Sequence, residues 1–142
     1  METNELHRGR LIDHIQLVVR DLAASQRFYA AVLAVLQVPI GGSGPGFFWA
    51  DELFVSDAQS PAAQGTLTGR IHLAFQATDK ATVDAFYEAA VANGGVDNGK
   101  PGEREYHPGY YAAFVLDPDG NNIEAVFHGA ATRSAQSVKI TF

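Results

Sequence analysis

The residues best suited to chemistry in this chain are two histidines and a glutamate, each within a short apolar segment. They are His14, His72 and Glu124. Two neutral imidazoles and one carboxylate form a facial triad, which holds a divalent cation and leaves coordination positions open for a substrate. Each residue alone also has an ordinary explanation, because strand histidines are often structural and a strand glutamate can be solvated on an open sheet face. The surrounding pattern favours the metal hypothesis.

An internal repeat places the two histidines in equivalent positions. When the sequence is shifted by 58 residues, DHIQLVVRDLAASQRFYAAVL aligns with IHLAFQATDKATVDAFYEAAV. The alignment superimposes His14 on His72, Asp21 on Asp79, and Phe28-Tyr29 on Phe86-Tyr87. Several matches in one register without a gap indicate a duplicated structural unit.

Each unit has the pattern of a β-α-β-β-β motif, and the chain therefore has an expected α+β fold. Alternating apolar residues after each histidine predict a strand, and Asp21 or Asp79 supplies a side chain that can begin a helix. We expect helices at about 22–36 and 80–93, the second ending at Asn93-Gly94-Gly95. Short strands should follow each helix, most clearly in FFWADELFVSDA of the first unit and YYAAFVLDPDGNNIEAVFH of the second.

Strand alternation sorts the side chains between the two faces of each sheet. If Leu17 faces its helix, then His14 and Gln16 point to the opposite face. The same rule places His72 and Glu124 on the helix-free face of the second unit, together with Gln76. If the two sheets pair, these faces form one polar-lined cavity. A cation there would offset the cost of burying the carboxylate, and the glutamines could support the ligands.

The repeat also sets boundaries within the 142 residues, which have room for one compact domain. Unit one should span about 11–57, a linker about 58–69, unit two about 70–128, and a tail 129–142. The tail is either an extension or an added strand. The Gly-rich GGSGPG at 41–46 lacks the following helix of a phosphate-binding loop, so we interpret it as a flexible connection.

Composition excludes several classes of function. The net charge of −6 gives no electrostatic basis for binding nucleic acid or an anionic membrane. No apolar run approaches the roughly 20 residues of a membrane span, and METNELHRGR has no apolar signal-peptide centre. With no cysteine, the chain has neither disulfides nor thiolate chemistry. We therefore expect a cytoplasmic protein whose partner is a small-molecule substrate.

These segments resemble the vicinal oxygen chelate superfamily. The opening DHIQLVVRDL with FYAAVL, the segment RIHLAF and the ending YYAAFVLDPDGNNIEAV carry the resemblance over about residues 11–128. The superfamily includes glyoxalase I, extradiol ring-cleaving dioxygenases, fosfomycin-modifying enzymes, methylmalonyl-CoA epimerase and bleomycin-resistance proteins. The resemblance implies two tandem βαβββ units that form a cupped half-barrel sheet with helices on its outer face. It also implies a homodimer, because members commonly complete or cover their cavity with a second subunit.

The resemblance also implies the metal ligands. In the metal-dependent members, the histidine that opens the first strand matches His14, the histidine that opens the second unit matches His72, and the glutamate after DPDGN matches Glu124. One divalent metal ion is therefore implied, Fe, Mn, Zn or Ni. Glyoxalase I usually adds a fourth ligand from the late strands of the first unit, where the best candidates here are Glu52, Ser56 and Asp57. Three protein ligands look more like an extradiol dioxygenase, or an enzyme that activates its substrate by chelation.

Further candidates lie near the predicted cavity. Tyr110 and Tyr111 open the strand beside Glu124, so one should face the cavity and the other the helix. His107, in the preceding loop, could act as an acid or base near neutral pH or be an ordinary solvated residue. His128 shares the parity of Glu124 and should lie at the rim of the cavity. The catalytic candidates are thus Glu124, His107, Tyr110 and Tyr111.

Two functions from different classes follow. The first is a metal-dependent enzyme that chelates two neighbouring oxygens of a small organic substrate, either a glyoxalase-like lyase or isomerase or an extradiol-type dioxygenase. The alternative is a metal-free drug-binding protein of the bleomycin-resistance type, whose acidic surface would suit a cationic drug. Phe47, Phe48 and Trp49 offer an apolar wall for a ligand or a dimer contact. The three candidate ligands favour the enzyme.

Overall fold

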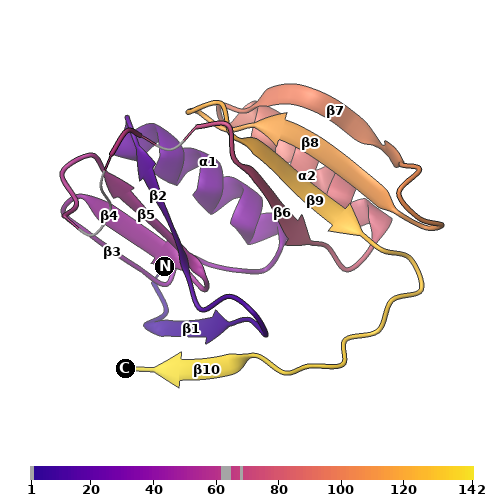
Figure 1. Ribbon diagram of the computed structural model, residues 1–142, viewed down its shortest axis with the longest axis horizontal. Helices are drawn as coiled ribbons and strands as arrows, with labels where there is room; N and C mark the ends of the chain where they lie inside the picture. Colours follow the sequence, from indigo (N-terminus) through magenta and orange to yellow (C-terminus); the bar gives the residue numbers. More distant parts are fainter. Residues whose placement is uncertain (1, 62–64, 68) are drawn as a thin grey trace.

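The computed structural model describes residues 2–61, 65–67 and 69–142 and contains two copies of one βαβββ arrangement (Figure 1). The first copy consists of β2 (Ile15–Val19), α1 (Leu22–Val35), β3 (Gly42–Gly44), β4 (Phe47–Ala50) and β5 (Leu53–Asp57). The second consists of β6 (His72–Gln76), α2 (Lys80–Ala92), β7 (Val96–Glu103), β8 (Tyr111–Leu116) and β9 (Asn122–Phe127). Each copy forms its own four-stranded sheet, in the orders β2-β5-β4-β3 and β6-β9-β8-β7. The predicted α+β fold with two tandem βαβββ units is confirmed. The predicted linker at about 58–69 includes residues 62–64 and 68, which lie outside the described residues.

Aspartates begin both helices, as the sequence predicts. Asp21 accepts a hydrogen bond from the amide of Ala24 at 3.0 Å, and Asp79 accepts one from the amide of Thr82 at 2.7 Å. These carboxylates satisfy amide groups that have no partner within the helix. After α2 the chain turns at Gly94, whose φ of +95° is a conformation that favours glycine. In the described part of the chain, neither helix is long and apolar enough to cross a membrane.

The predicted alternation of side chains is present in both units. Leu17 and Val19 are buried beneath α1, whereas His14 is exposed. In β6, Leu73 and Phe75 pack against the hydrophobic core, and the alternate residues His72, Ala74 and Gln76 are exposed. One face of each sheet therefore forms the core, and the other face is available for a site.

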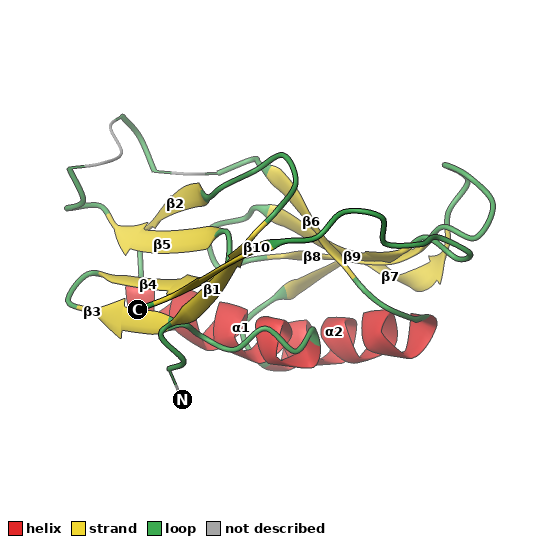
Figure 2. Ribbon diagram, turned by 90° about the horizontal axis from the view of Figure 1, so that it is seen from below, coloured by secondary structure: helices red, strands yellow, loops and turns green. Residues whose placement is uncertain are grey.

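Both helices lie on the same side of the two sheets, and the opposite side carries no helix (Figure 2). The helices pack antiparallel, since Arg27 in the first half of α1 donates to the carbonyl of Ala92 at the end of α2, at 3.1 Å. Figure 1 shows that β2 and β6 accordingly run in opposite directions. The residues at the start of β2 and at the start of β6 therefore stand at opposite ends of the molecule.

The structure decides one alternative that the sequence left open and contradicts one interpretation. The tail is an added strand, because β10 (Val138–Thr141) pairs antiparallel with β1 (Glu5–Arg8), a strand that the sequence pattern does not predict. The interpretation of GGSGPG as a flexible connection is wrong, since β3 within it pairs with β4. Its glycines are needed there because a Cβ atom on Gly41 would lie 2.0 Å from the ring of Trp49.

Candidate functional site

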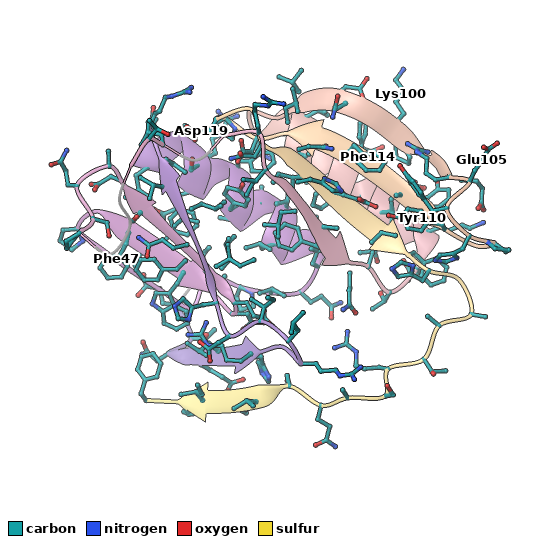
Figure 3. All side chains as sticks on the ribbon, in the orientation of Figure 1. Phe47, Lys100, Glu105, Tyr110, Phe114 and Asp119 are labelled. Carbon is teal, nitrogen blue, oxygen red and sulfur yellow. The ribbon has the colours of Figure 1, made fainter. Side chains whose placement is uncertain are left out.

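Glu124 lies on the helix-free face of the second sheet, yet only 1% of its surface is exposed. In β9 it stands between Ala74 of β6 and Phe114 of β8. Its Oε1 atom lies 2.9 Å from Nε2 of His72, and its Oε2 atom accepts a hydrogen bond from the hydroxyl of Tyr110. Figure 3 shows Phe114 and Tyr110 over this sheet. Both carboxylate oxygens therefore have a partner, which offsets the loss of water around a buried charge.

The hydrogen bonds of His72 indicate that a cation belongs between this ring and Glu124. Nδ1 of His72 lies 3.0 Å from the carbonyl oxygen of Asn122, so this nitrogen carries a hydrogen and donates it. In the neutral ring Nε2 then bears a lone pair and faces a carboxylate oxygen, which is also an acceptor. A proton or a metal ion between the two atoms makes the contact favourable. A carbonyl that fixes the other ring nitrogen is also typical of metal-bound histidines.

The distance between these atoms suits two ligands of one metal ion. Ligand atoms that each lie about 2.1 Å from a metal at a right angle stand about 3 Å apart. The separation of Nε2 of His72 and Oε1 of Glu124 is 2.9 Å. The separation therefore fits two of the three ligands of the predicted facial triad.

The two neighbouring tyrosines point to opposite faces of the sheet, as the alternation predicts. Burial, together with the hydrogen bond to Glu124, raises the pKa of Tyr110 well above its ordinary value, so its hydroxyl remains a donor at neutral pH. Tyr111 lies on the helix side, where its hydroxyl donates to Asp84 of α2 at 2.7 Å. Tyr110 is thus part of the site. Tyr111, the other tyrosine among the catalytic candidates, is not part of the site, because its hydroxyl is hydrogen-bonded to Asp84 on the other face of the sheet.

Two histidines form a stacked pair next to Tyr110. Nε2 of His107 lies 2.8 Å from Nδ1 of His128, and the ring centroids are 5.1 Å apart. Nδ1 of His107 donates to the carbonyl of Pro108 at 2.8 Å, so Nε2 of the same neutral ring is an acceptor. The hydrogen between the two rings therefore belongs to Nδ1 of His128. Each ring packs edge-on against Tyr110 at 5.3 Å. The pair lies beside the buried carboxylate without a direct hydrogen bond to it.

His14 is not grouped with the other two predicted ligands within one chain. Its Nδ1 atom contacts Asp13 at 2.6 Å, and its side chain is 58% exposed. Because β2 and β6 run in opposite directions, the residues that precede them lie at opposite ends of the sheets. Within the described residues, no group of three or more His, Cys, Asp or Glu side chains is placed to hold a metal ion. The expected convergence of all three ligands in a single chain is therefore not found.

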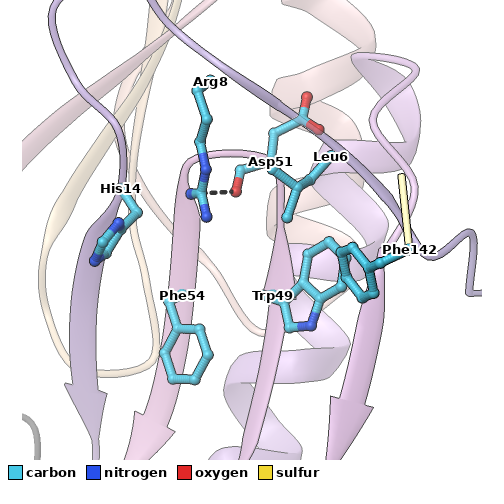
Figure 4. Close-up of a pocket in the computed structure, with 7 residues that line it drawn as sticks. All are labelled: Leu6, Arg8, His14, Trp49, Asp51, Phe54 and Phe142. Atoms are coloured by element: carbon cyan, nitrogen blue, oxygen red, sulfur yellow. Dashed lines mark hydrogen bonds between the residues drawn. The ribbon is translucent and has the colours of Figure 1, made fainter. Parts of the chain in front are cut away.

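A cavity of about 230 Å³ opens beside His14 instead (Figure 4). The residues that line it are Leu6, Arg8, His14, Trp49, Asp51, Phe54 and Phe142. The rings of Trp49 and Phe142 lie 5.7 Å apart, so the residue that follows β10 forms one wall. The sequence pattern gave no signal for Arg8 or Phe142 here, because the pairing of β1 with β10 brings them from the two ends of the chain.

The register of the sheets shows which residue of unit one corresponds to Glu124. Gln16 aligns with Ala74 in the repeat, and Gln16 pairs with Phe54 as Ala74 pairs with Glu124. Phe54 has no atom that can bind a metal, so the equivalent position in the first unit is closed to a fourth ligand.

The other polar residues of unit one are engaged locally. Of the fourth-ligand candidates, Ser56 accepts a hydrogen bond from Gln16 at 2.9 Å and Asp57 accepts one from the amide of Gln59 at 2.9 Å. Burial raises the pKa of Glu52, the third candidate. In the second unit, Gln76 accepts a hydrogen bond from Arg133 at 3.4 Å. The two glutamines are therefore bonded to groups other than the predicted ligands.

Comparison with known proteins adds independent evidence. Residues 11–125 match the sequence profile of the Glyoxalase/Bleomycin resistance protein/Dioxygenase superfamily. The chain is 32% identical over 126 residues to the uncharacterized protein YqjT of Bacillus subtilis (strain 168), covering 80% of this chain and 95% of that one. A glyoxalase/bleomycin resistance protein from Albidiferax ferrireducens T118 is 30% identical, with a TM-score of 0.66 over 82% of this chain and 97% of that one. A lactoylglutathione lyase from Agrobacterium tumefaciens has 22% identity and a TM-score of 0.62, covering 83% and 93%, a likeness of fold.

Proposed function

Because this chain belongs to the Glyoxalase/Bleomycin resistance protein/Dioxygenase superfamily, we propose that it is a metal-dependent enzyme that binds two neighbouring oxygens of a small organic substrate. The observation that carries the proposal is the contact of His72 with Glu124, in which Nε2 of the neutral ring and a carboxylate oxygen are both acceptors and need a proton or a metal ion between them. A bound divalent metal ion would supply a Lewis acid that stabilises an enolate or catecholate oxygen.

The residues around the metal position have distinct tasks in this proposal. The carbonyl of Asn122 holds the ring of His72 in the form whose Nε2 atom is free to bind. Tyr110 orients the carboxylate of Glu124 through its second oxygen. At the rim, His128 can take up a proton on its Nε2 atom. It can then pass the hydrogen on its Nδ1 atom to Nε2 of His107. This pair is therefore the proposed acid and base.

We also propose that the active form is a homodimer, in which His14 of one copy completes the ligand set of the other. A single chain separates His14 from His72 and Glu124 at opposite ends of its sheets. The helix-free face of β6 is exposed and can accept a second copy. Two-fold symmetry then supplies two equivalent sites, each with three protein ligands.

Two reactions fit this arrangement. A lyase or isomerase of glyoxalase type must move a proton, which the pair of His107 and His128 can do. An extradiol-type dioxygenase needs open metal positions, and Phe54 in place of a fourth ligand leaves one more position open. Turnover of a panel of 2-oxoaldehyde–thiol adducts and catechols is measured together with oxygen consumption. Turnover that consumes oxygen identifies a dioxygenase, and turnover that consumes none identifies a lyase or isomerase.

One observation favours a second candidate function, the metal-free binding of a drug. The cavity beside His14 has aromatic walls from Trp49, Phe54 and Phe142, and its charged lining residues are Asp51 and Arg8. Aromatic faces and a carboxylate suit a cationic aromatic ligand. Under this alternative the protein binds cationic glycopeptide drugs with no turnover and no need for metal.

The decisive experiment is metal analysis of protein purified without an affinity tag and supplemented in turn with Fe, Mn, Zn and Ni. We expect one metal ion per site in the wild type. Glu124→Gln should lower metal affinity by more than the roughly 10–100-fold typical of losing a supporting residue, because the anionic ligand itself is lost. Glu88→Gln, which makes the same change on the exposed face of α2, should bind metal as the wild type does. Wild-type protein that takes up none of the four metals would refute the proposal and favour drug binding.

A further inference from the structure

An arginine stands beside the metal position on the helix-free face of the second sheet. Arg104 follows β7, and its guanidinium lies 5.3 Å over the ring of Phe114. Two of its nitrogens donate to carbonyl oxygens, Nη2 to Lys100 at 2.7 Å and Nη1 to Glu103 at 3.3 Å. These contacts hold the guanidinium in one place against the sheet.

Phe114 connects this guanidinium to the proposed ligands. In the sheet, Phe114 is the residue paired with Glu124. The ring of His72 stacks on the ring of Phe114, with centroids 5.9 Å apart and an interplanar angle of 29°. Arg104 and His72 thus both lie against one aromatic ring. A planar ligand that lay across the edge of this ring would have His72 at one end and Arg104 at the other.

The charge of Arg104 is not neutralised by an acidic partner. Among the described residues, no carboxylate oxygen lies within ion-pair distance of it, whereas the adjacent Glu103 pairs with Lys80 at 3.1 Å. Burial and the hydrogen bond to Glu124 raise the pKa of Tyr110, and the positive charge of Arg104 only partly opposes this rise.

A second guanidinium lies on the same face. Arg133 donates to Gln76 at the end of β6 at 3.4 Å and likewise has no carboxylate partner in the part of the chain that the structure describes. In a chain with 16 acidic and 10 basic residues, two guanidinium groups with no carboxylate partner among the described residues therefore contact this one face. This local excess of positive charge opposes the acidic balance of the whole chain and suits an anionic ligand.

We propose that Arg104, held against Phe114, binds a carboxylate of the substrate, so that the substrate class is a planar oxygen chelator that carries a carboxylate group. The guanidinium is planar and binds a carboxylate through two parallel hydrogen bonds, which also fixes the orientation of the ligand. The vicinal oxygens of the same molecule then face His72 and Glu124. The role given to the vicinal oxygens rests on the proposed function. The role given to the carboxylate does not, because it needs only Arg104.

The test compares two probes that differ only in the carboxylate, 3,4-dihydroxybenzoate and catechol. Their dissociation constants are measured by isothermal titration calorimetry on the full chain, with zinc and after chelation of metal. We expect the wild type to bind 3,4-dihydroxybenzoate about 10-fold or more tightly than catechol, as a charge-assisted hydrogen-bond pair predicts. Arg104→Met should remove this preference and leave the affinity for catechol unchanged.

Two further variants separate ligand binding from a structural role of Arg104 in β7. Arg104→Lys retains the charge without the paired hydrogen bonds, so its preference should be intermediate. Arg10→Met removes an exposed arginine between β1 and β2 and should retain the full preference. If Arg104→Met does not fold, an intermediate preference in Arg104→Lys together with a weaker preference of the wild type at high salt supports the proposal.

The outcomes for this inference and for the proposed function are distinguishable. A preference for 3,4-dihydroxybenzoate that persists without metal supports the carboxylate site even if the metal role fails. Affinity for catechol that disappears on chelation supports the metal role by itself. A wild type without preference for the carboxylate, a wild type that binds neither probe, or a folded Arg104→Met variant that retains the preference would overturn the inference.

Discussion

At the scale of the residue, Glu124 shows how one side chain can be buried on the open face of a sheet. Its carboxylate is covered by Tyr110, His72 and Phe114, and two of these supply polar contacts to its two oxygens. Such contacts are needed because a buried carboxylate without partners costs several kcal/mol. The same contacts orient the carboxylate toward the position of the proposed metal ion.

The neighbouring tyrosines provide a matched test at this scale. Tyr110→Phe removes the hydroxyl that orients Glu124, so we expect metal affinity to fall by about 10–100-fold, the usual effect of losing a supporting hydrogen bond. Tyr111→Phe removes the same atom on the other face of the sheet, where it bonds to Asp84, and should leave metal affinity unchanged. Zinc titration of both variants checks this. Equal losses in the two variants would show that Tyr110 acts only through general stability.

At the scale of the element, the DPDGNN turn joins the two units. Asp117 accepts hydrogen bonds from the amides of Asp119 and Asn121, and its Oδ2 atom accepts one from the hydroxyl of Tyr29 in α1 at 2.5 Å. Gly120 has a φ of +85°, which explains the glycine at this point of the turn. The turn before β9 therefore positions Glu124 and also fixes the first helix against the second unit.

Replacing Tyr29 should reveal this link in the free energy of unfolding. We expect Tyr29→Phe to lower it by about 1–3 kcal/mol at pH 7, because Asp117 is buried and loses a donor. Tyr87 is the equivalent residue in α2, and its side chain is half-buried. Tyr87→Phe should therefore lower the free energy of unfolding by less. Urea denaturation of both variants measures the difference. Comparable losses would mean that the hydrogen bond between the units contributes little.

The cost of Tyr29→Phe should also depend on pH. Burial, with the adjacent Asp117, raises the pKa of Tyr29 well above its ordinary value. Above the unfolded-state pKa of about 10, the unfolded chain loses this proton while the folded protein keeps it, so the wild type loses stability as pH rises. Phenylalanine has no such loss, and the difference between the two proteins should shrink above about pH 10. A constant difference across that range would contradict the assignment.

At the scale of the whole molecule, the two-unit arrangement separates residues that the repeat makes equivalent. The antiparallel packing of α1 and α2 sends β2 and β6 in opposite directions, so His14 and His72 stand far from one another in one chain. In the proposed homodimer, the cavity beside His14 and the pair of His72 with Glu124 would be two half-sites. A second copy related by a two-fold axis can bring one of each together.

Mixing two defective variants tests the homodimer directly. Neither His14→Ala nor Glu124→Gln should bind metal tightly as a homodimer. In a mixed dimer, the intact His14 comes from one variant and the intact Glu124 from the other, so one of its two sites is complete. After subunit exchange of equal amounts we expect about a quarter of all sites to bind metal. Metal content that stays at the level of the separate variants, or a monomer in light scattering at micromolar concentration, would rule out the shared site.

The sequence alone determined the local features of this protein. The repeat predicted both βαβββ units, and Asp21 and Asp79 predicted the two helix starts. Alternation predicted that one of Tyr110 and Tyr111 shares a face with Glu124 and that the other faces the helix. These features follow from periodicities and hydrogen bonds within a few residues of each other, which a sequence displays directly. Alternation also placed His72 and Glu124 on the same face of the second unit, and the parallel pairing of β6 with β9 brings them together.

Only the tertiary structure decided how the two units face one another. The pairing of β1 with β10, the strand within GGSGPG and the separation of His14 from Glu124 depend on contacts between segments far apart in the chain. The same is true of Arg104, whose position over Phe114 arises from the pairing of β7 with β8. Local patterns specify which face of a strand a residue occupies. They carry no information on the packing of one sheet beside another, because that packing is selected by the buried surface that both units contribute together.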